Sequence, residues 1–227
     1  MRTIWNAFAR FWQAEKSLSV LLAVLVLSEF VEPVIAPERG AHDPVTGVFL
    51  SFVLIAGAAG VWRHARPGVR VVALVGCVSA LVVWWAAWFN PGGIVATWRP
   101  ASTAIGLVVL ALVVVSSVLR AGTVTRHQIE GAIAAFLLLG LAWASAYEWV
   151  ALHDPLAFRG LGVADAMEWT YFSFVTLTTV GYGDITPVSP AARSLAITES
   201  ITGLMYVAIL ISRLVALSLH SRESGAS

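Results

Sequence analysis

Charged residues are scarce in this chain. Lysine, arginine, aspartate and glutamate together make up 12% of its 227 residues, whereas hydrophobic residues make up 59%. That proportion is far too apolar for an ordinary soluble domain. The formal net charge of +1 argues against nucleic acid as a partner. Composition therefore indicates an all-α membrane protein, because several apolar runs reach the ~20 residues that a spanning helix needs.

Cysteine is almost absent as well. Cys77 is the single cysteine and lies inside an apolar run, which excludes an intrachain disulfide and suggests a small buried hydrophobic side chain. The chain also lacks a phosphate-binding glycine loop, and its five histidines show no metal-ligand spacing. We therefore expect neither enzymatic activity nor a cofactor.

Six long apolar runs organise what is present. We expect transmembrane helices at about 18–36, 45–62, 69–89, 101–119, 128–152 and 191–219. A shorter run at 167–177 cannot cross a bilayer, so it is expected to be re-entrant. Residues 1–17 place aromatic and charged side chains on opposite faces of a helix, which favours a helix lying in the membrane interface. A frayed tail is the alternative there.

The basic residues predict the orientation. With a cytoplasmic N terminus, ten basic residues lie inside: Arg2, Arg10, Lys16, Arg63, Arg66, Arg70, Arg120, Arg126, Arg213 and Arg222. Only four lie outside: Arg39, Arg99, Arg159 and Arg193. This asymmetry follows the positive-inside rule and places both termini in the cytoplasm.

One polar stretch interrupts the apolar chain between the short run and the last long run. Residues 178–184 read Thr-Thr-Val-Gly-Tyr-Gly-Asp. Glycines that alternate with large residues suit a backbone that turns its carbonyls the same way, because positive φ is cheap only for glycine. The alternative is a loop whose glycines merely serve a turn. Irregular backbone at membrane depth, however, occurs only where protein or a watery cavity satisfies it.

The string from Thr176 to Asp184 resembles the signature sequence of potassium channels, with an unbroken match from Thr178 to Asp184. The resemblance implies a selectivity filter in which Thr179, Val180, Gly181 and Tyr182 present backbone carbonyls to K⁺. Gly181 and Gly183 would hold the unusual backbone angles. One chain supplies one such loop and a closed ring needs four, so the expected unit is a homotetramer with four-fold symmetry.

The resemblance also identifies residues that support the filter. These are Thr178, Asp184, Trp169, Tyr171 and Phe172. Tyr171 and Phe172 stand where relatives carry aromatic residues packed as a cuff around the filter, and Val175 stands where some carry a glutamate. Without that carboxyl, Asp184 is expected to bond a pore-helix side chain, either Trp169 or Tyr171.

The last apolar run holds two further candidates. Gly203 resembles the hinge glycine of the inner helix, and close helix packing is the alternative. Glu199 is an ionisable residue inside a spanning run and hence a functional candidate. A structural hydrogen bond behind the pore is favoured over contact with the ion, with Thr198, Ser200 and Thr202 sharing its surroundings.

The chain therefore divides near Gly122. Residues 18–122 are predicted to form a four-helix bundle that resembles a voltage sensor, although no arginine lies between Pro100 and Leu119 to carry gating charge. Residues 123–220 form the pore domain, and 221–227 a polar tail. Because the connector near Gly122 is short, residues 18–119 are expected to pack on the pore helices of their own subunit.

These features predict a K⁺-selective channel that conducts passively and is not steeply gated by voltage. Its partners are membrane lipid, K⁺ and three copies of itself, and its location is a plasma membrane, bacterial by the compactness of the chain. Two alternatives remain: a subunit of a potassium transport system, and a non-conducting membrane scaffold or sensor.

Overall fold

A computed structural model describes residues 17–28, 44–64, 67–120, 126–161 and 166–224. The interfacial helix expected at 1–17 and the connector at Gly122 therefore lie outside the described residues, apart from Ser17. The helices are α2 (Ser17–Val26), α4 (Pro44–His64), α5 (Pro67–Phe89), α6 (Ile94–Arg120), α7 (Arg126–His153), α8 (Ala166–Leu177) and α9 (Pro190–Ser224). Two short strands, β1 (Phe158–Arg159) and β2 (Thr186–Pro187), pair antiparallel.

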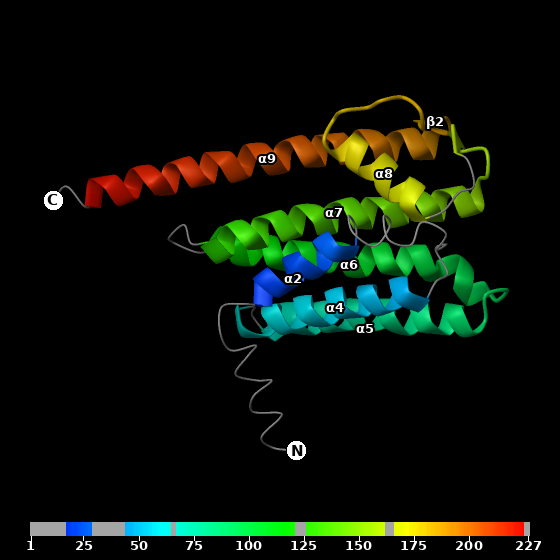
Figure 1. The fold of residues 1–227 in the computed structure, drawn as a ribbon, viewed down its shortest axis with the longest axis horizontal. Helices are drawn as coiled ribbons and strands as arrows, with labels where there is room; N and C mark the ends of the chain where they lie inside the picture. The colour runs from blue at the N-terminus through cyan, green and yellow to red at the C-terminus, as the bar shows by residue number, and fades with distance from the viewer. Residues whose placement is uncertain (1–16, 29–43, 65–66, 121–125, 162–165, 225–227) are drawn as a thin grey trace, which may run out of the picture.

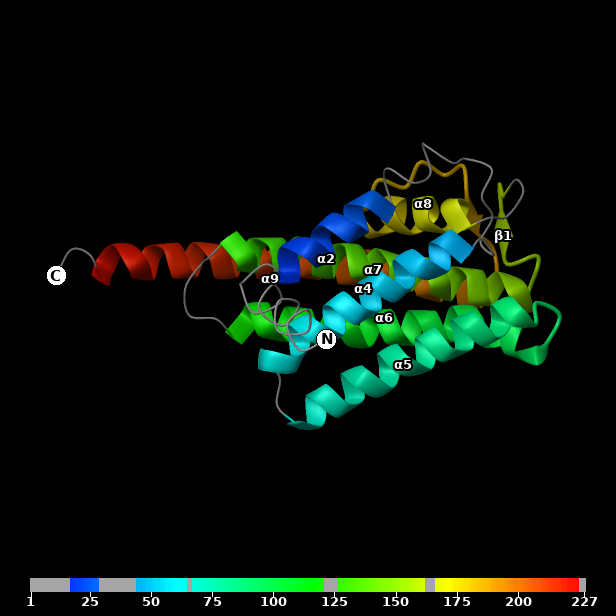
Figure 2. The same cartoon turned by 60° about the horizontal axis from the view of Figure 1, so that its bottom comes forward.

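The long helices run side by side, with α7 at the centre (Figure 1). On one side α6 lies against α7 and α5 lies against α6, while α2 and α4 cover this bundle. On the other side α9 runs along α7, with the short helix α8 packed against both of them. The C-terminal part of α9 continues past the ends of the bundle helices in both views (Figure 2).

Four of the described helices are long and apolar enough to cross a membrane. Their candidate spans are Arg70–Phe89, Ile94–Leu119, Gln128–His153 and Pro190–Arg213. The chain is thus a mostly helical, multi-pass membrane protein. Helix α4 adds a shorter apolar stretch, Pro44–Ala58, and α2 has only 10 residues within the described part of the expected run 18–36.

Two helix ends differ from the sequence prediction. Helix α6 begins at Ile94, so Arg99 lies inside the helix and is buried, instead of lying in an outer loop. Helix α9 extends to Ser224, so most of the tail expected at 221–227 is helical. The apolar pattern could not place these ends, because helix geometry continues through polar residues as long as the backbone bonds are made.

The bundle is held by close packing at small residues. A Cβ built on Gly106 of α6 would lie 2.8 Å from the Cβ of Ala80 and 3.2 Å from the carbonyl oxygen of Gly76, both on α5. Small residues of this kind let two helix backbones approach in a membrane. Helices α5 and α6 therefore form a rigid pair against which α4 and α7 pack.

Candidate functional site

The helix before the candidate filter is anchored to α7. The ring of Phe174 lies over Gly140, where a built Cβ would come within 2.6 Å of it. The fully buried hydroxyl of Ser173 lies 2.7 Å from the carbonyl oxygen of Gly140. The small residue on α7 thus lets α8 approach closely and lets its serine reach the α7 backbone.

The segment that follows α8 has alternating backbone conformations. Gly181 and Gly183 have φ values of 59° and 82°, the positive values that glycine adopts at little cost. Thr179 also has a positive φ of 59°, and it is the only non-glycine residue with positive φ in the described part of the chain. A β-branched residue in this region is strained, and such strain persists where the surrounding structure requires it, commonly at functional sites.

The amide groups at the start of this segment point back to α8. The N–H of Thr179 donates to the carbonyl of Thr176 at 2.9 Å, and the N–H of Val180 donates to that of Val175 at 2.9 Å. Within the described residues, no hydrogen bond ends on a carbonyl oxygen of residues 179–182. Val180 and Tyr182 are 52% and 72% exposed. These four carbonyls are therefore available to a ligand outside the chain.

Asp184 follows the C-terminal end of the segment. Its carboxylate accepts a hydrogen bond from the hydroxyl of Tyr171 at 2.6 Å and another from the N–H of Ile185 at 3.0 Å. The ring of Tyr182 lies parallel to that of Tyr171, with centroids 6.4 Å apart. Of the two donors that the sequence left open, the structure places Tyr171 against Asp184, whereas Trp169 is buried elsewhere.

The same hydrogen bond changes how both groups titrate. The Tyr171 hydroxyl, helped by the Ile185 amide, holds the pKa of Asp184 below its usual range. Conversely, the carboxylate raises the pKa of Tyr171 to about 12. Asp184 therefore stays ionised, and Tyr171 stays a donor, over the whole physiological range.

The two-strand pairing positions the chain beyond Asp184. Phe158 pairs with Pro187 and Arg159 with Thr186, and Gly160 follows with a φ of 88°. A Cβ on Gly160 would overlap the carbonyl oxygen of Asp184. Only glycine fits at this position, because the backbone of one loop lies directly against the other.

Aromatic side chains of α8 separate into two groups. Tyr171 is exposed beside the filter segment, whereas Phe172 and Trp169 are buried on the other face of the helix. There they join Phe158 and Tyr147, with edge-to-face contacts at centroid distances of 4.8–5.7 Å. Within one chain, Phe172 therefore packs away from the filter, while the cuff remains a prediction for the assembled protein.

Glu199 lies behind the filter segment, completely buried. Its carboxyl group accepts a hydrogen bond from Tyr147 of α7, and it lies 2.6 Å from the Ser173 hydroxyl of α8. The neighbours that the sequence suggested lie elsewhere, since the hydroxyls of Thr198, Ser200 and Thr202 bond carbonyls of their own helix. Glu199 thus joins three helices and makes the structural hydrogen bonds that the sequence favoured.

Gly203 lies one helical turn after Glu199 and touches the C-terminal end of α8. A Cβ there would overlap the carbonyl oxygen of Leu177. Beside it, the Ser200 hydroxyl lies 3.4 Å from the carbonyl oxygen of Thr176. The structure therefore shows close packing at Gly203, while its role as a hinge stays a prediction.

Residues 135–218 match the ion channel family model. This segment starts within α7 and includes α8, the filter segment and most of α9. Three curated relatives are similar to short parts of the chain, and all are potassium channels by name. The two-pore potassium channel c of rice is 48% identical over 61 residues, which are 27% of this chain and 13% of the relative.

The two-pore potassium channel 1 of Arabidopsis thaliana is 50% identical over 52 residues, which are 23% of this chain and 14% of the relative. The potassium channel K1 of Plasmodium berghei is 40% identical over 48 residues, 21% of this chain and 2% of the relative. The chain thus spans a small share of the relatives it matches. No solved structure matches it significantly. These similarities support a potassium channel family, and ion channel families conduct without catalysis.

Sequence reasoning missed several residues of this site. Thr179 gives no signal of its positive φ, because threonine normally avoids that region. Tyr147 and Ser173 are 26 residues apart in sequence and meet only through Glu199. Their one signal is chemical: a buried carboxyl group requires donors, and hydroxyls on neighbouring helices can supply them. Among the described residues, no three His, Cys, Asp or Glu side chains gather as a metal site.

Proposed function

We propose that this chain is one subunit of a K⁺-selective channel that conducts passively through a tetrameric pore. The observation that carries the proposal is the segment 179–183, where positive φ values alternate and carbonyl oxygens lack partners in their own chain. Such carbonyls can replace the hydration shell of a K⁺ ion as it passes. The carbonyls of Thr179, Val180, Gly181 and Tyr182 would line the pore, and Gly183 and Asp184 would lie at its outer end.

The tetramer follows from the geometry of a ring. A single chain supplies one strand of carbonyls, and four strands around an axis are needed to surround an ion. The apolar side chains of α9 favour the same assembly, since Ile197, Ile201 and Leu204 are each more than half exposed in the single chain. K⁺ is the cargo of this site, and the proposal needs no cofactor.

Three relatives indicate which ion the chain would conduct. All three are potassium channels, and each aligned stretch is short compared with the relative's own length. They support K⁺ as the ion and leave the rest of each relative uncompared. We propose six spans from the six apolar runs and cytoplasmic termini from the charge asymmetry, in a plasma membrane that we take to be the inner membrane of a bacterium.

The conductance is expected to depend weakly on voltage. A steep response needs three or four charges per subunit that move through the field, each supplying ~2.3 kcal/mol per 100 mV. Within the described part of α6, Arg99 is paired with Glu148, and the next arginine is Arg120 at the helix end. A current that rises steeply with voltage would contradict this expectation.

A flux assay tests the proposal. The purified chain is reconstituted into liposomes, and K⁺ efflux is compared with Na⁺ efflux and with empty liposomes. Selective, passive K⁺ flux from the chain alone supports a channel over a transport subunit that needs partners. Absence of flux from a correctly assembled tetramer would favour the non-conducting scaffold or sensor.

A further inference from the structure

Adjacent residues of α7 make polar contacts toward opposite parts of the molecule. Tyr147 donates to Glu199 of α9 behind the filter, while Glu148 pairs with Arg99 of α6 in the outer bundle. Successive residues of an α-helix are ~100° apart, so neighbouring side chains naturally face different partners. The bundle contact and the pore contact therefore meet on one rigid helical turn.

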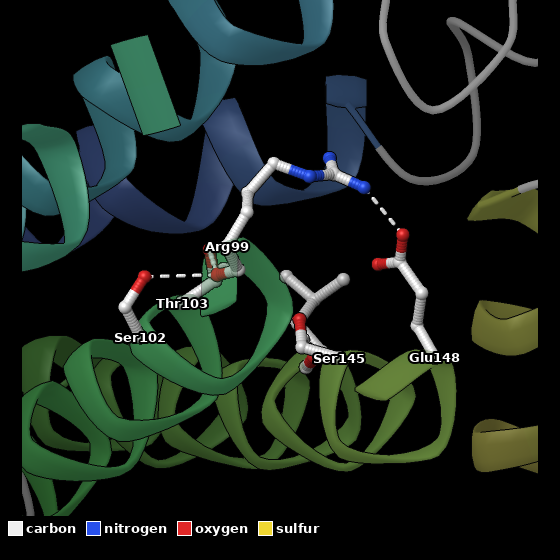
Figure 3. Close-up of polar contacts among 6 residues, drawn as sticks. Arg99, Ser102, Thr103, Ser145 and Glu148 are labelled. Atoms are coloured by element: carbon white, nitrogen blue, oxygen red, sulfur yellow. Dashed lines mark hydrogen bonds and ion pairs between the residues drawn. The ribbon is translucent and has the colours of Figure 1, made fainter. Parts of the chain in front are cut away.

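The bundle side of this turn is built around Arg99. Its guanidinium group pairs with Glu148 and lies over the ring of Trp84 of α5, 4.6 Å from the centroid. The side chains of Arg99 and Glu148 are 5% and 19% exposed. Figure 3 shows the arginine reaching from α6 to the carboxylate on α7. One side chain thus joins α5, α6 and α7.

The local backbone supports the position of Arg99. Hydroxyls of Ser102 and Thr103 both donate to its carbonyl oxygen at 2.9 Å, next to Pro100 (Figure 3). Proline cannot donate the backbone bond expected at its position in a helix and so disturbs the ladder. The amide missing at Pro100 would have bonded the carbonyl of Ala96, so the two hydroxyls do not replace that bond; they add local contacts to the Arg99 carbonyl instead.

The pore side of the turn leads to the pore helix. Tyr147, Glu199 and Ser173 are all completely buried, and the Ser173 hydroxyl lies 2.6 Å from the Glu199 carboxyl group. Ser173 lies five residues before Thr178, on the helix whose C-terminal carbonyls hold the first filter amides. A displacement of Tyr147 therefore moves the contact that positions α8.

A buried ion pair adds little net stability, because desolvation cancels much of its attraction, and its best-attested role is to specify register. An apolar contact would allow α6 to slide along α7, whereas a paired guanidinium and carboxylate define one position. This physical difference favours a positioning role for the Arg99–Glu148 pair over a purely stabilising one.

We propose that Arg99 and Glu148 are positioning residues of the pore. By setting how the outer bundle lies on α7, they set where Tyr147 holds the Glu199–Ser173 contact, and hence the pore helix and filter. The inference rests on the proposed K⁺ channel function. It assigns to the bundle an influence on the filter that passes directly across α7.

A double-mutant cycle in the full-length reconstituted chain tests this inference. The bundle side is removed by Arg99→Met with Glu148→Met, which removes both charges of this ion pair and so preserves folding better than either change alone. The pore side is removed by Tyr147→Phe. Ser145→Ala is the matched control, because Ser145 lies on the same turn region of α7 and bonds only its own helix, at the carbonyl of Leu141.

We measure K⁺ binding by calorimetry and the K⁺/Na⁺ flux ratio in liposomes. The double Met variant and Tyr147→Phe are each expected to weaken K⁺ binding by roughly tenfold, within the range of coupling between packed sites, and Ser145→Ala by none. When both changes are combined, the loss of K⁺ affinity should be much smaller than the product of the two separate losses, because both changes break the same connection. Additive losses, or wild-type K⁺ binding in the folded double Met variant, overturn the inference.

A milder variant decides the matter if the Met variants do not assemble. Arg99→Lys keeps the charge but loses the planar fork that meets a carboxylate and an indole ring together. K⁺ binding weaker than wild type with normal assembly supports the inference, and binding equal to wild type overturns it. If the wild-type tetramer itself shows no selective K⁺ flux, the proposed function fails and the inference fails with it.

Discussion

Helices α6 and α9 lie on opposite sides of α7, and the single chain buries a much larger fraction of α6 than of α9. In an 18-residue apolar window of the α6 span Ile94–Leu119, 44% of the residues are buried, against 11% in the equivalent window of the α9 span Pro190–Arg213. Helix α6 finds apolar partners and an ion pair within its own chain. Among the α9 residues whose burial is described, Ala192, Glu199 and Gly203 are buried, whereas Ile197, Ile201 and Leu204 are each more than half exposed.

This difference shows which part of the molecule is packed within a single chain and which part is left exposed. Helices α2, α4, α5 and α6 share one hydrophobic core with α7. The pore side makes its polar contacts behind the filter but leaves the filter and α9 exposed. We therefore expect changes near α9 to alter conduction and assembly, and equivalent changes in α6 to alter mainly the stability of the bundle.

The largest expected effect comes from the filter glycines. Gly181→Ala or Gly183→Ala should abolish selective K⁺ flux, because a Cβ at positive φ costs ~1–2 kcal/mol in each of four copies. A Cβ at either position meets no atom within 4 Å, so the strain lies in the backbone. Gly92→Ala is the control, since that loop glycine has the same free space without positive φ. Normal K⁺/Na⁺ flux ratios in both filter variants would refute the filter assignment.

The second effect compares packing glycines on the two helices. Gly203→Ala forces α9 away from the Leu177 carbonyl at the end of α8 and should reduce flux and tetramer stability, with overpacking costing ~1–3 kcal/mol per chain. Gly106→Ala in α6 crowds Ala80 and should lower thermal stability with the K⁺/Na⁺ ratio unchanged. Flux and unfolding are measured for both. Equal losses of flux from the two variants would contradict the expectation that α9 affects conduction while α6 affects mainly stability.

A smaller effect is expected at Glu199. Glu199→Leu leaves the buried hydroxyl of Tyr147 without its acceptor, at a cost of ~1–3 kcal/mol, whereas the Ser173 hydroxyl loses the carboxyl group but keeps the Gly140 carbonyl. Glu199→Gln keeps the shape and an acceptor oxygen, so it should lose less. Thermal unfolding of the tetramer measures both. Thr198→Val, one residue earlier and exposed, is the control, and a loss equal to that of Glu199→Leu would contradict the buried network.

The smallest effect depends on pH. The lowered pKa of Asp184 means that its hydrogen bonds stabilise the folded filter above the usual carboxyl pKa, ~4, and are lost as pH falls through the lowered value. Tyr171→Phe removes the main cause, so the loss should begin at higher pH. We measure K⁺ selectivity against pH. Tyr206→Phe is the control, because Tyr206 lies on α9 and its hydroxyl donates to the carbonyl of Ala132 on α7. An unchanged profile in Tyr171→Phe would show that Asp184 does not depend on this donor.

Much of the fold followed from apolar periodicity, because a membrane demands long runs and internally bonded backbone. The runs near 69–89, 101–119, 128–152 and 191–219 each contain a helix with a candidate span. The first run has a described helix only at Ser17–Val26, so six spans remain a prediction. Helix ends were less certain: Arg99 was expected in a loop and lies inside α6.

For the candidate site, too, some features could be predicted from the sequence and others required the structure. The seven residues 178–184 predicted a filter through their resemblance to the potassium-channel signature, and the glycines at 181 and 183 have the positive φ that their alternation indicated. The choice between Tyr171 and Trp169 as the donor to Asp184 could not be made from spacing. It required the rotation of α8, which Phe174 on Gly140 and Ser173 on the α7 backbone establish.

The sequence alone thus determined the local chemistry: apolar helices for a bilayer, a short helix at 166–177, and a glycine-containing segment with available carbonyls. Tertiary structure decided which distant groups meet. It buried Arg99 with Glu148 and joined Tyr147 and Ser173 at Glu199, contacts across three separate helices. The physical reason is that backbone preference acts between neighbours in the chain, whereas burial and pairing of polar groups depend on how whole helices pack.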